Sequence, residues 1–312
     1  MWLLISLSLA LTMHPQIDHG VDEAKRLEAD GRLDQARDRY EEVLRTKPTD
    51  EEARDGMSIT SEKLALNERA AGRLDNALAI LLRARSIEPD DQRVLLDLGI
   101  LEDEMMLDHD AAETLEHLEL LKPNDPNVSY AFARVDLNLG RLEAAENEMQ
   151  RYLDARPQDA SAHYGMGRIY LQGLQFEKAK RELERSISLQ PKQSEAYYQL
   201  GQADLYENEF EESIRQFHRT LERDPQHGGA LAGIGTAYFK LKQYPAAKEW
   251  LQRAIQAAPE YQPGHYYLGL TLARLGEADA SHRELKIATD LAEKDARQAA
   301  TRLRLNGPDG QP

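Results

Sequence analysis

The sequence predicts an all-α protein built from about eight consecutive repeats, each consisting of two helices. The first observation is a series of prolines spaced 34 residues apart, which are Pro89, Pro123, Pro157, Pro191, Pro225 and Pro259. Self-similarity at a fixed period of this size is the sequence signature of a solenoid, in which each repeat packs on its neighbours. The second observation is the composition, because 30% of the residues are charged and only 6% are aromatic. Apolar residues spread this thinly are typical of helical proteins with a large surface.

The first element is an apolar N-terminal segment, residues 1–16, which precedes the repeats. The stretch from Trp2 to Met13 carries no charge and is too short to span a bilayer as a helix. It is similar to the apolar region of a secretory signal, although no Lys or Arg precedes it. Two interpretations stay open: a signal or anchor that directs export, and an apolar first helix or an overextended start. The localisation, periplasmic or secreted against cytoplasmic, stays open with them.

The repeats fill residues 17–295 when each frame ends two residues past its proline. The eight frames are 17–50, 58–91, 92–125, 126–159, 160–193, 194–227, 228–261 and 262–295, and the last lacks the proline. Seven extra residues, 51–57, separate the first two frames. They could lengthen the following helix by about two turns, roughly 10 Å of rise. A looped insertion is the alternative, and Gly56 favours it.

Three positions inside the frame keep the same character in all eight repeats. The eighth residue is small: Ala24, Ala65, Gly99, Ala133, Gly167, Gly201, Gly235 and Gly269. The twentieth is also small: Ala36, Ala77, Ala111, Ala145, Ala179, Ser213, Ala247 and Ser281. The twenty-fourth is large and apolar: Tyr40, Leu81, Leu115, Met149, Leu183, Phe217, Leu251 and Leu285. Two helices that cross closely need small residues where their axes approach and large ones in the flanking holes. Each frame is therefore predicted to be a packed helix pair, which the proline ends.

This pattern of small and large residues in a 34-residue frame resembles that of the tetratricopeptide repeat family. The seventh frame has Ile234-Gly235 and Tyr238 in its first half, then Ala247, Leu251 and Pro259 in its second. The resemblance covers residues 17–295 and implies a right-handed superhelix of sixteen repeat helices, an α-solenoid. It also implies that the first helices of successive repeats line a concave face.

The C-terminal element is predicted to cap the array. Small and apolar residues continue at helical spacing past frame eight, and Glu293 stands where the proline would end the helix. A solenoid needs a polar-faced terminal segment, so residues 296–305 are predicted to be a capping helix. Gly307 and Pro308 then predict that residues 306–312 are a flexible tail.

Acidic residues occupy two unusual places in the frames. The eleventh position, which is usually large and apolar, is acidic in four frames, as Glu68, Glu102, Asp136 and Asp204. We expect these side chains to be partly exposed or paired with a neighbouring Arg. In the third frame, Asp110 and Glu113 are spaced as a helix cap and the acid that completes it, which we favour over a metal site beside His109.

Several function classes are disfavoured. The absence of cysteine excludes disulfides, zinc ribbons and thiol catalysis. A net charge of −16 argues against nucleic-acid binding. No nucleotide, zinc-protease, calcium-loop or serine-hydrolase motif is present. We therefore predict no catalytic, cofactor-binding or metal-ligating residue, no cofactor and no stable membrane span.

The resemblance places a candidate partner-binding stripe on the concave face. It implies that the second, fifth, sixth, ninth, twelfth and thirteenth frame residues point inward, and the stripe takes its residues from the fifth, ninth and thirteenth. The stripe consists of Tyr130, Arg134, Asn138, Tyr164, Arg168, Gln172, Tyr198, Gln202, Tyr206 and Tyr266. Aromatic rings beside aligned arginines suit a peptide groove. Packing of the tyrosines against neighbouring helices is the alternative interpretation.

The two halves of the chain differ in charge and aromatic content. Residues 17–125 carry 29 acids and 15 bases, whereas residues 126–312 carry 26 and 24. We therefore predict a non-enzymatic protein-interaction scaffold that holds a peptide or helix of a partner, with acidic residues between apolar anchors, in its second half. The alternatives are an exported assembly factor for a surface or secretion complex, and a recruiting subunit of an enzyme whose catalytic site is on another chain.

Overall fold

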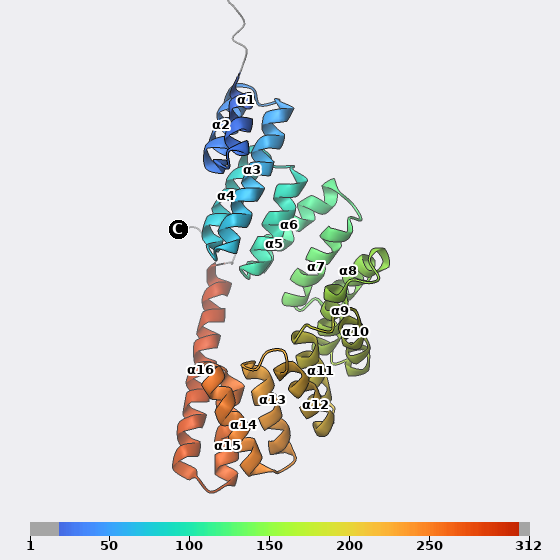
Figure 1. The fold of residues 1–312 in the computed structure, drawn as a ribbon, viewed down its shortest axis with the longest axis vertical. Helices are drawn as coiled ribbons and strands as arrows, with labels where there is room; N and C mark the ends of the chain where they lie inside the picture. The colour runs from blue at the N-terminus through green and yellow to red at the C-terminus, as the bar shows by residue number, and fades with distance from the viewer. Residues whose placement is uncertain (1–18, 306–312) are drawn as a thin grey trace, which may run out of the picture. The chain divides into compact units, whose positions relative to one another are not determined.

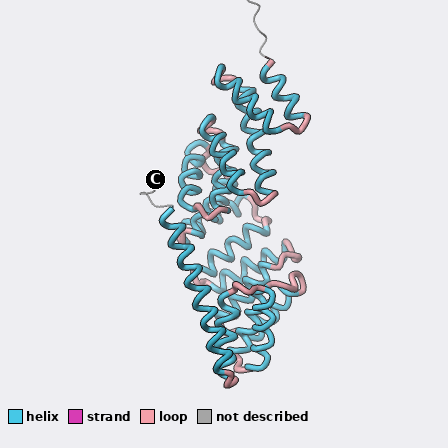
Figure 2. The backbone as a smooth tube through the Cα atoms, turned by 90° about the vertical axis from the view of Figure 1, so that its left-hand side faces the viewer, coloured by secondary structure: helices cyan, strands magenta, loops and turns pink. Residues whose placement is uncertain are grey.

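The computed structural model describes residues 19–305, and of residues 298–305 only the backbone. Within this range the chain forms sixteen α-helices and no strand. Short loops join the helices (Figure 2). The chain divides into two compact units, which we call unit 1, up to Met105, and unit 2, from Met106. The predicted all-α repeat architecture is confirmed.

Unit 1 consists of five described helices, coloured blue to cyan in Figure 1. They are α1 (Gly20–Ala29), α2 (Leu33–Thr46), α3 (Glu51–Ala70), α4 (Leu74–Ile87) and α5 (Gln92–Glu104). Each helix packs on the next one in the chain, and α3 also contacts both α1 and α5. The first helices of successive repeats therefore form one continuous row.

Unit 2 repeats this arrangement over eleven described helices (Figure 1). They are α6 (Asp108–Leu121), α7 (Pro126–Asn138), α8 (Leu142–Ala155), α9 (Ala160–Gln172), α10 (Phe176–Leu189), α11 (Glu195–Tyr206), α12 (Phe210–Leu221), α13 (Gly228–Lys240), α14 (Tyr244–Ala257), α15 (Gln262–Arg274) and α16 (Ala278–Leu305). The odd-numbered helices α7 to α15 contact one another in sequence, whereas the described even-numbered helices contact only their chain neighbours. The odd-numbered helices thus form the closely spaced inner row.

The helix crossings in unit 2 explain the small residues of the frame. A Cβ added to Gly235 would lie 2.5 Å from Leu251 Cγ, and one added to Gly201 would lie 2.8 Å from the Phe217 ring. These distances are shorter than any relaxed carbon–carbon contact, so a side chain at the eighth position would push the two helices of its repeat apart. The predicted pairing of small and large positions is confirmed here.

The seven extra residues are helical, which decides between the two alternatives. Residues 51–57 form the first two turns of α3, a helix of 20 residues. Gly56 lies under the ring of Tyr40, and a Cβ there would come within 2.3 Å of Tyr40 Cζ. The glycine therefore makes room for a buried aromatic ring from α2 and does not mark a loop.

The turn inside each repeat fixes where the second helix starts. One residue per turn has a positive φ, and the spacing follows the repeat: Gly31, Gly72, Met106, Gly140, Leu174, Asn208, Lys242 and Gly276. Glycine adopts this conformation without cost, whereas Leu174, with a φ of 56°, is strained. The second helix begins two residues later in every repeat.

Because the turn fixes the start of the second helix, the predicted helix cap at Asp110 is wrong. Helix α6 begins at Asp108, its cap residue is Leu107, and no side chain bonds the cap. Asp110 therefore lies within the first turn, where a negative charge favours the helix N-terminus without capping it. The side-chain caps belong instead to the first helices, where Asp50, Asp91, Asp125 and Asp159 each accept from backbone N–H groups at 2.7–3.2 Å.

Three of the four acidic eleventh positions, Glu102, Asp136 and Asp204, are more buried than expected. Glu68 accepts from Arg73 Nε at 2.6 Å, and this hydrogen bond lowers its pKa to about 2. Asp136 is buried and lies 3.5 Å from Arg141 Nη1. Asp204 is also buried, and its partner is a lysine, with Lys180 Nζ at 2.8 Å. Partial exposure is wrong for Glu102, which is 3% exposed.

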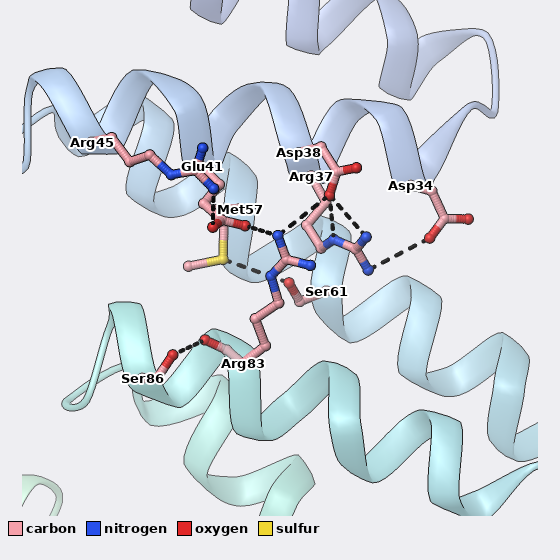
Figure 3. Close-up of polar contacts among 9 residues, drawn as sticks. All are labelled: Asp34, Arg37, Asp38, Glu41, Arg45, Met57, Ser61, Arg83 and Ser86. Atoms are coloured by element: carbon pink, nitrogen blue, oxygen red, sulfur yellow. Dashed lines mark hydrogen bonds and ion pairs between the residues drawn. The ribbon is translucent and has the colours of Figure 1, made fainter.

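An ion-pair network connects the second helices of the first two repeats (Figure 3). Arg37 on α2 is almost buried, at 13% side-chain exposure, and lies 2.9 Å from Asp38 and 3.5 Å from Asp34. Arg83 on α4 reaches across to Asp38 at 3.8 Å and to Glu41. Side chains therefore bridge two helices whose backbones are not in contact.

The last helix continues without a break through the predicted capping segment. Helix α16 runs over 28 residues from Ala278 to Leu305, so residues 296–305 are its end and not a separate helix. It extends past α15 in Figure 1. The predicted signal segment and flexible tail, residues 1–16 and 306–312, lie outside the described residues.

Candidate functional site

The candidate site lies on the inner row of unit 2. Because the frame repeats every 34 residues and the odd-numbered helices stack in sequence, equivalent side chains from successive first helices stand beside one another. The stripe residues come from α7, α9, α11 and α15. Nine of the ten line one of three neighbouring cavities.

The first cavity lies between α7 and α9 and has a volume of about 240 Å³. Its lining includes five of the six stripe residues of these two helices: Tyr130, Arg134, Asn138, Tyr164 and Arg168. The second cavity, of about 430 Å³, begins at Arg168 and adds Gln172, Tyr198, Gln202 and Tyr206. Arg168 is shared, so the two cavities adjoin.

The third cavity lies among α11, α13 and α15 and has a volume of about 380 Å³. It shares Gln202, Tyr206 and Tyr261 with the second cavity. The shared residues join the three cavities into one continuous feature, which we call the groove. Tyr266 does not line it. Tyr266 is 42% exposed, and its ring packs edge-on against that of Tyr267, which lines the groove.

Among the groove residues that the predicted stripe leaves out, three have large polar or charged side chains that bear on its chemistry: Tyr267, Lys240 and Tyr261. Tyr267 and Lys240 stand at the sixth and thirteenth frame positions, which the resemblance already turns inward. Tyr261 is the cap residue ahead of α15, outside the inward set. Repeat position could have identified the first two, whereas Tyr261 reaches the groove through the angle at which the chain enters α15.

The groove is cationic within an acidic protein. Its lining contains Arg134, Arg168 and Lys240, and no Asp or Glu is among the residues that line the three cavities. Arg168 and Lys240 form no ion pair within the described part of the chain. The local field in the groove is therefore positive, opposite to the net charge of −16.

The tyrosines of the groove differ in how much they pack. The Tyr130 ring lies 4.8 Å from that of Tyr152, and the Tyr198 ring lies 5.9 Å from that of Phe217. Burial raises the pKa of Tyr164 and Tyr198. Tyr206, by contrast, is 66% exposed. Packing and groove lining thus coexist in the half-buried tyrosines Tyr130, Tyr164 and Tyr198, and Tyr206 is the most exposed of the four.

A hydrogen-bond chain sets the polar wall between the second and third cavities. Gln202 Nε2 donates to the Tyr198 hydroxyl at 3.0 Å, and this hydroxyl lies 3.4 Å from that of Tyr261. His227 packs on the Tyr198 ring at 4.6 Å, and its Nε2 lies 3.1 Å from Glu195 Oε1. The hydrogen bond with Glu195 raises the pKa of His227. These contacts hold Tyr198 in one orientation.

Comparison with known families decides the assignment. Profiles of the tetratricopeptide repeat match residues 105–169, 140–205 and 198–261. The chain belongs to the tetratricopeptide repeat family. This family is in general a non-catalytic fold that mediates protein–protein interactions, so the protein is an interaction scaffold at that level. No curated protein matches the sequence.

Solved structures share the fold at low sequence identity. A tetratricopeptide repeat protein from Parabacteroides merdae is 14% identical, with a TM-score of 0.59 over 82% of this chain and 98% of its own. Pseudomonas aeruginosa PilF is 16% identical, with a TM-score of 0.57 over 68% and 96%. The Cut9–Hcn1 structure of the APC/C gives 15% identity and a TM-score of 0.63, over 93% of this chain and 56% of its own.

Two kinds of feature are absent from the described residues. None of the helices is both long enough and apolar enough to cross a membrane. No group of three or more His, Cys, Asp or Glu side chains is placed to hold a metal ion.

Proposed function

We propose that the groove of unit 2 binds an extended segment of a partner protein in which acidic residues alternate with apolar anchors. The observation that carries this proposal is the charge of the lining, three cations and no carboxylate in a protein of net charge −16. Arg168 and Lys240 form no ion pair within the described residues. A ligand that covers these two cations removes their solvation, and a carboxylate of that ligand compensates for the loss.

The aromatic rings supply the second part of the interaction. Tyrosine offers a large apolar area with two rotatable angles and a polar tip, which is why it is enriched at binding surfaces. Tyr130, Tyr164, Tyr198 and Tyr206 follow one another from α7 to α11 and alternate with Arg134 and Arg168. A bound segment would therefore meet an aromatic surface and a cation in each of the repeats of α7 and α9, and two more tyrosines on α11.

The proposal is tested by reversing the groove charges. Replacing Arg134 and Arg168 together by Glu should weaken partner binding by about 1–3 kcal/mol, since two charge-assisted contacts are lost. The matched control is Arg181→Glu with Arg185→Glu on α10. Both arginines are exposed, and neither lines the groove. The control changes the net charge by the same amount within the same unit.

The measurement compares proteins captured from native extract by the wild type and both variants, followed by calorimetry with each captured protein. Partners that both the wild type and the α10 control retain and that the groove variant loses support the proposal. Equal retention by all three forms would contradict it. The acidic triplet 102–104 is not a suitable comparison, because Glu102 and Asp103 are buried at 3% and 5% exposure.

A further inference from the structure

The third cavity exists because one tyrosine of the stripe is missing. The fifth frame position is Tyr in the frames that begin at 126, 160, 194 and 262, but it is Ala232 in the frame between the last two. The next residue, Gly233, has no side chain because the Phe217 ring fills that space, 2.4 Å from where a Cβ would lie. The small side chain of Ala232 on α13 thus leaves a hollow of about 380 Å³ among three repeats.

Tyrosine rings wall this hollow, which we call the tyrosine pocket, with Tyr206, Tyr261 and Tyr267 around Ala232 and Lys240. Tyr206 stacks almost parallel on Phe176, with centroids 5.6 Å apart and an angle of 14°. Tyr267 meets Phe239 edge-on at 5.8 Å. Neighbouring rings therefore hold both walls in place before any ligand binds, which reduces the entropy lost on binding.

A side chain with a hydroxyl group, Tyr261, lines the tyrosine pocket. Tyr198 accepts from Gln202, and within the described residues the only hydroxyl near its own proton is that of Tyr261, at 3.4 Å. If Tyr198 donates to Tyr261, its buried proton is satisfied. The Tyr261 proton is then left to donate to an acceptor in the pocket that it lines. Lys240 supplies a positive charge at the same pocket.

The donor and the charge identify the chemistry of the occupant. An aromatic cage alone would suit a cation, but Lys240 repels cations and no carboxylate lines the pocket to offset it. An aromatic side chain can meet the tyrosine rings edge-to-face or offset-stacked. A carboxylate beside that ring can accept from Lys240 and from the Tyr261 hydroxyl.

We propose that the tyrosine pocket takes an aromatic side chain of the partner protein that is directly followed by Asp or Glu. This inference rests on the proposed function of the groove and adds the residue pair that its third cavity selects. The cavity is larger than one aromatic side chain, which leaves room for the adjacent acid. Arg134 and Arg168 would then contact acids on one side of this anchor.

The test selects binders from a random 12-residue peptide library displayed on phage, with the full-length protein immobilised. The expected result is enrichment of Phe, Tyr or Trp directly followed by Asp or Glu. Enrichment of aromatic residues beside Lys or Arg, or of peptides without an aromatic residue, would overturn the inference. Failure to enrich any peptide would contradict the proposed function as well.

Variants then show which cavity binds the enriched pair. In fluorescence polarisation with a labelled enriched peptide, Lys240→Gln with Tyr261→Phe should weaken binding at least tenfold, because both contacts to the carboxylate are removed. Lys192→Gln with Tyr244→Phe is the matched control, since neither residue lines a cavity of the groove. An equal loss in both double variants would overturn the inference.

A variant that fills the tyrosine pocket completes the test. Ala232→Tyr restores the missing member of the stripe and should abolish the preference for an aromatic anchor, with circular dichroism confirming the fold. Because Ala232 is buried at 2% exposure, Tyr206→Ala is the second variant. It removes one exposed wall and should weaken binding at least fivefold. Peptides that lose affinity in Arg134→Glu with Arg168→Glu but bind all the pocket variants normally would preserve the proposed function and refute the tyrosine pocket.

Discussion

The inner rows of the two units use the same repeat but treat their positive charges differently. In unit 1, Lys25 Nζ lies 2.8 Å from Glu52, Lys63 Nζ lies 2.7 Å from Glu28, and Arg69 pairs with Glu104. In unit 2, Arg168 and Lys240 line cavities that contain no carboxylate. One scaffold therefore yields a surface that satisfies its own charges and another that leaves them available to a ligand.

The largest expected effect tests whether the two units are energetically separate. Gly201→Leu should destabilise unit 2 by about 3 kcal/mol, because its Cβ would lie 2.8 Å from the Phe217 ring. Solenoid stability is a sum of neighbouring terms, so α1 to α4 should keep their protection in hydrogen exchange. Gly56→Leu is the reciprocal variant, and it should expose unit 1 while α11 to α15 stay protected. Uniform loss of protection in either variant would show that the units are not separate.

The next largest loss of stability is expected for a lysine in unit 2 that forms ion pairs within the fold. Lys180 Nζ lies 2.8 Å from Asp204 and 2.7 Å from Glu209. Lys180→Met should cost about 2 kcal/mol, because it leaves the buried Asp204 without its counter-charge. Urea unfolding at pH 7 measures this cost, and Lys192→Met is the control. A neutral result for Lys180→Met would mean that this ion pair does not contribute to stability.

The stability of unit 1 should depend on pH because of a partly buried carboxyl group, that of Asp97. Burial, with Glu62 nearby, raises the pKa of Asp97 to about 6. The folded state therefore binds this proton more tightly than the unfolded state, and stability from this group rises as pH falls from about 7 to 4. Asp97→Asn should stabilise unit 1 by about 1 kcal/mol at pH 7.5, a figure reduced for partial exposure, and should flatten the pH profile. Hydrogen exchange in α3 to α5 measures the stability of unit 1 at each pH. If Asp97→Asn leaves the pH dependence of stability unchanged, Asp97 is not its source.

The smallest expected change in stability comes from a substitution in a turn of unit 2. Leu174 has a φ of 56°, at the position where Gly140 and Gly276 have 73° and 81°. Leu174→Gly should stabilise unit 2 by about 0.5 kcal/mol, because relief of strain exceeds the added chain entropy. Gly140→Leu should destabilise unit 2, because it places a side chain at a residue with a positive φ. Thermal unfolding of both variants measures the difference, and a destabilised Leu174→Gly would place the strain elsewhere.

Much of the fold was predictable because steric demands repeat every 34 residues. Small residues at Gly201 and Gly235 are required by helix crossing, so their spacing alone indicated the helix pairs. The cap at Asp110 was wrong because the positive-φ residue at Met106 fixes the start of α6 at Asp108, whatever acid follows. Gly56 suggested a loop because the ring that covers it, Tyr40, is 16 positions away in the chain.

The groove was predictable in part for the same reason. Nine stripe residues line it because equivalent frame positions stand side by side. The tyrosine pocket could not be predicted this way, since it depends on an absent side chain, Ala232, and on rings from two flanking repeats. Tyr261 enters it from a cap position that the repeat pattern does not assign to the inner face.

The difference between the two inner rows is tested most directly by removing one cation from each. Arg168→Gln in the groove and Lys63→Gln in unit 1 make the same charge change, and both are titrated calorimetrically with an enriched acidic aromatic peptide. The account predicts that Arg168→Gln weakens binding about tenfold, or ~1.4 kcal/mol, without altering stability. It predicts that Lys63→Gln leaves binding unchanged and lowers only the stability of unit 1, by about 0.5 kcal/mol. Weaker binding in Lys63→Gln with normal binding in Arg168→Gln would contradict it.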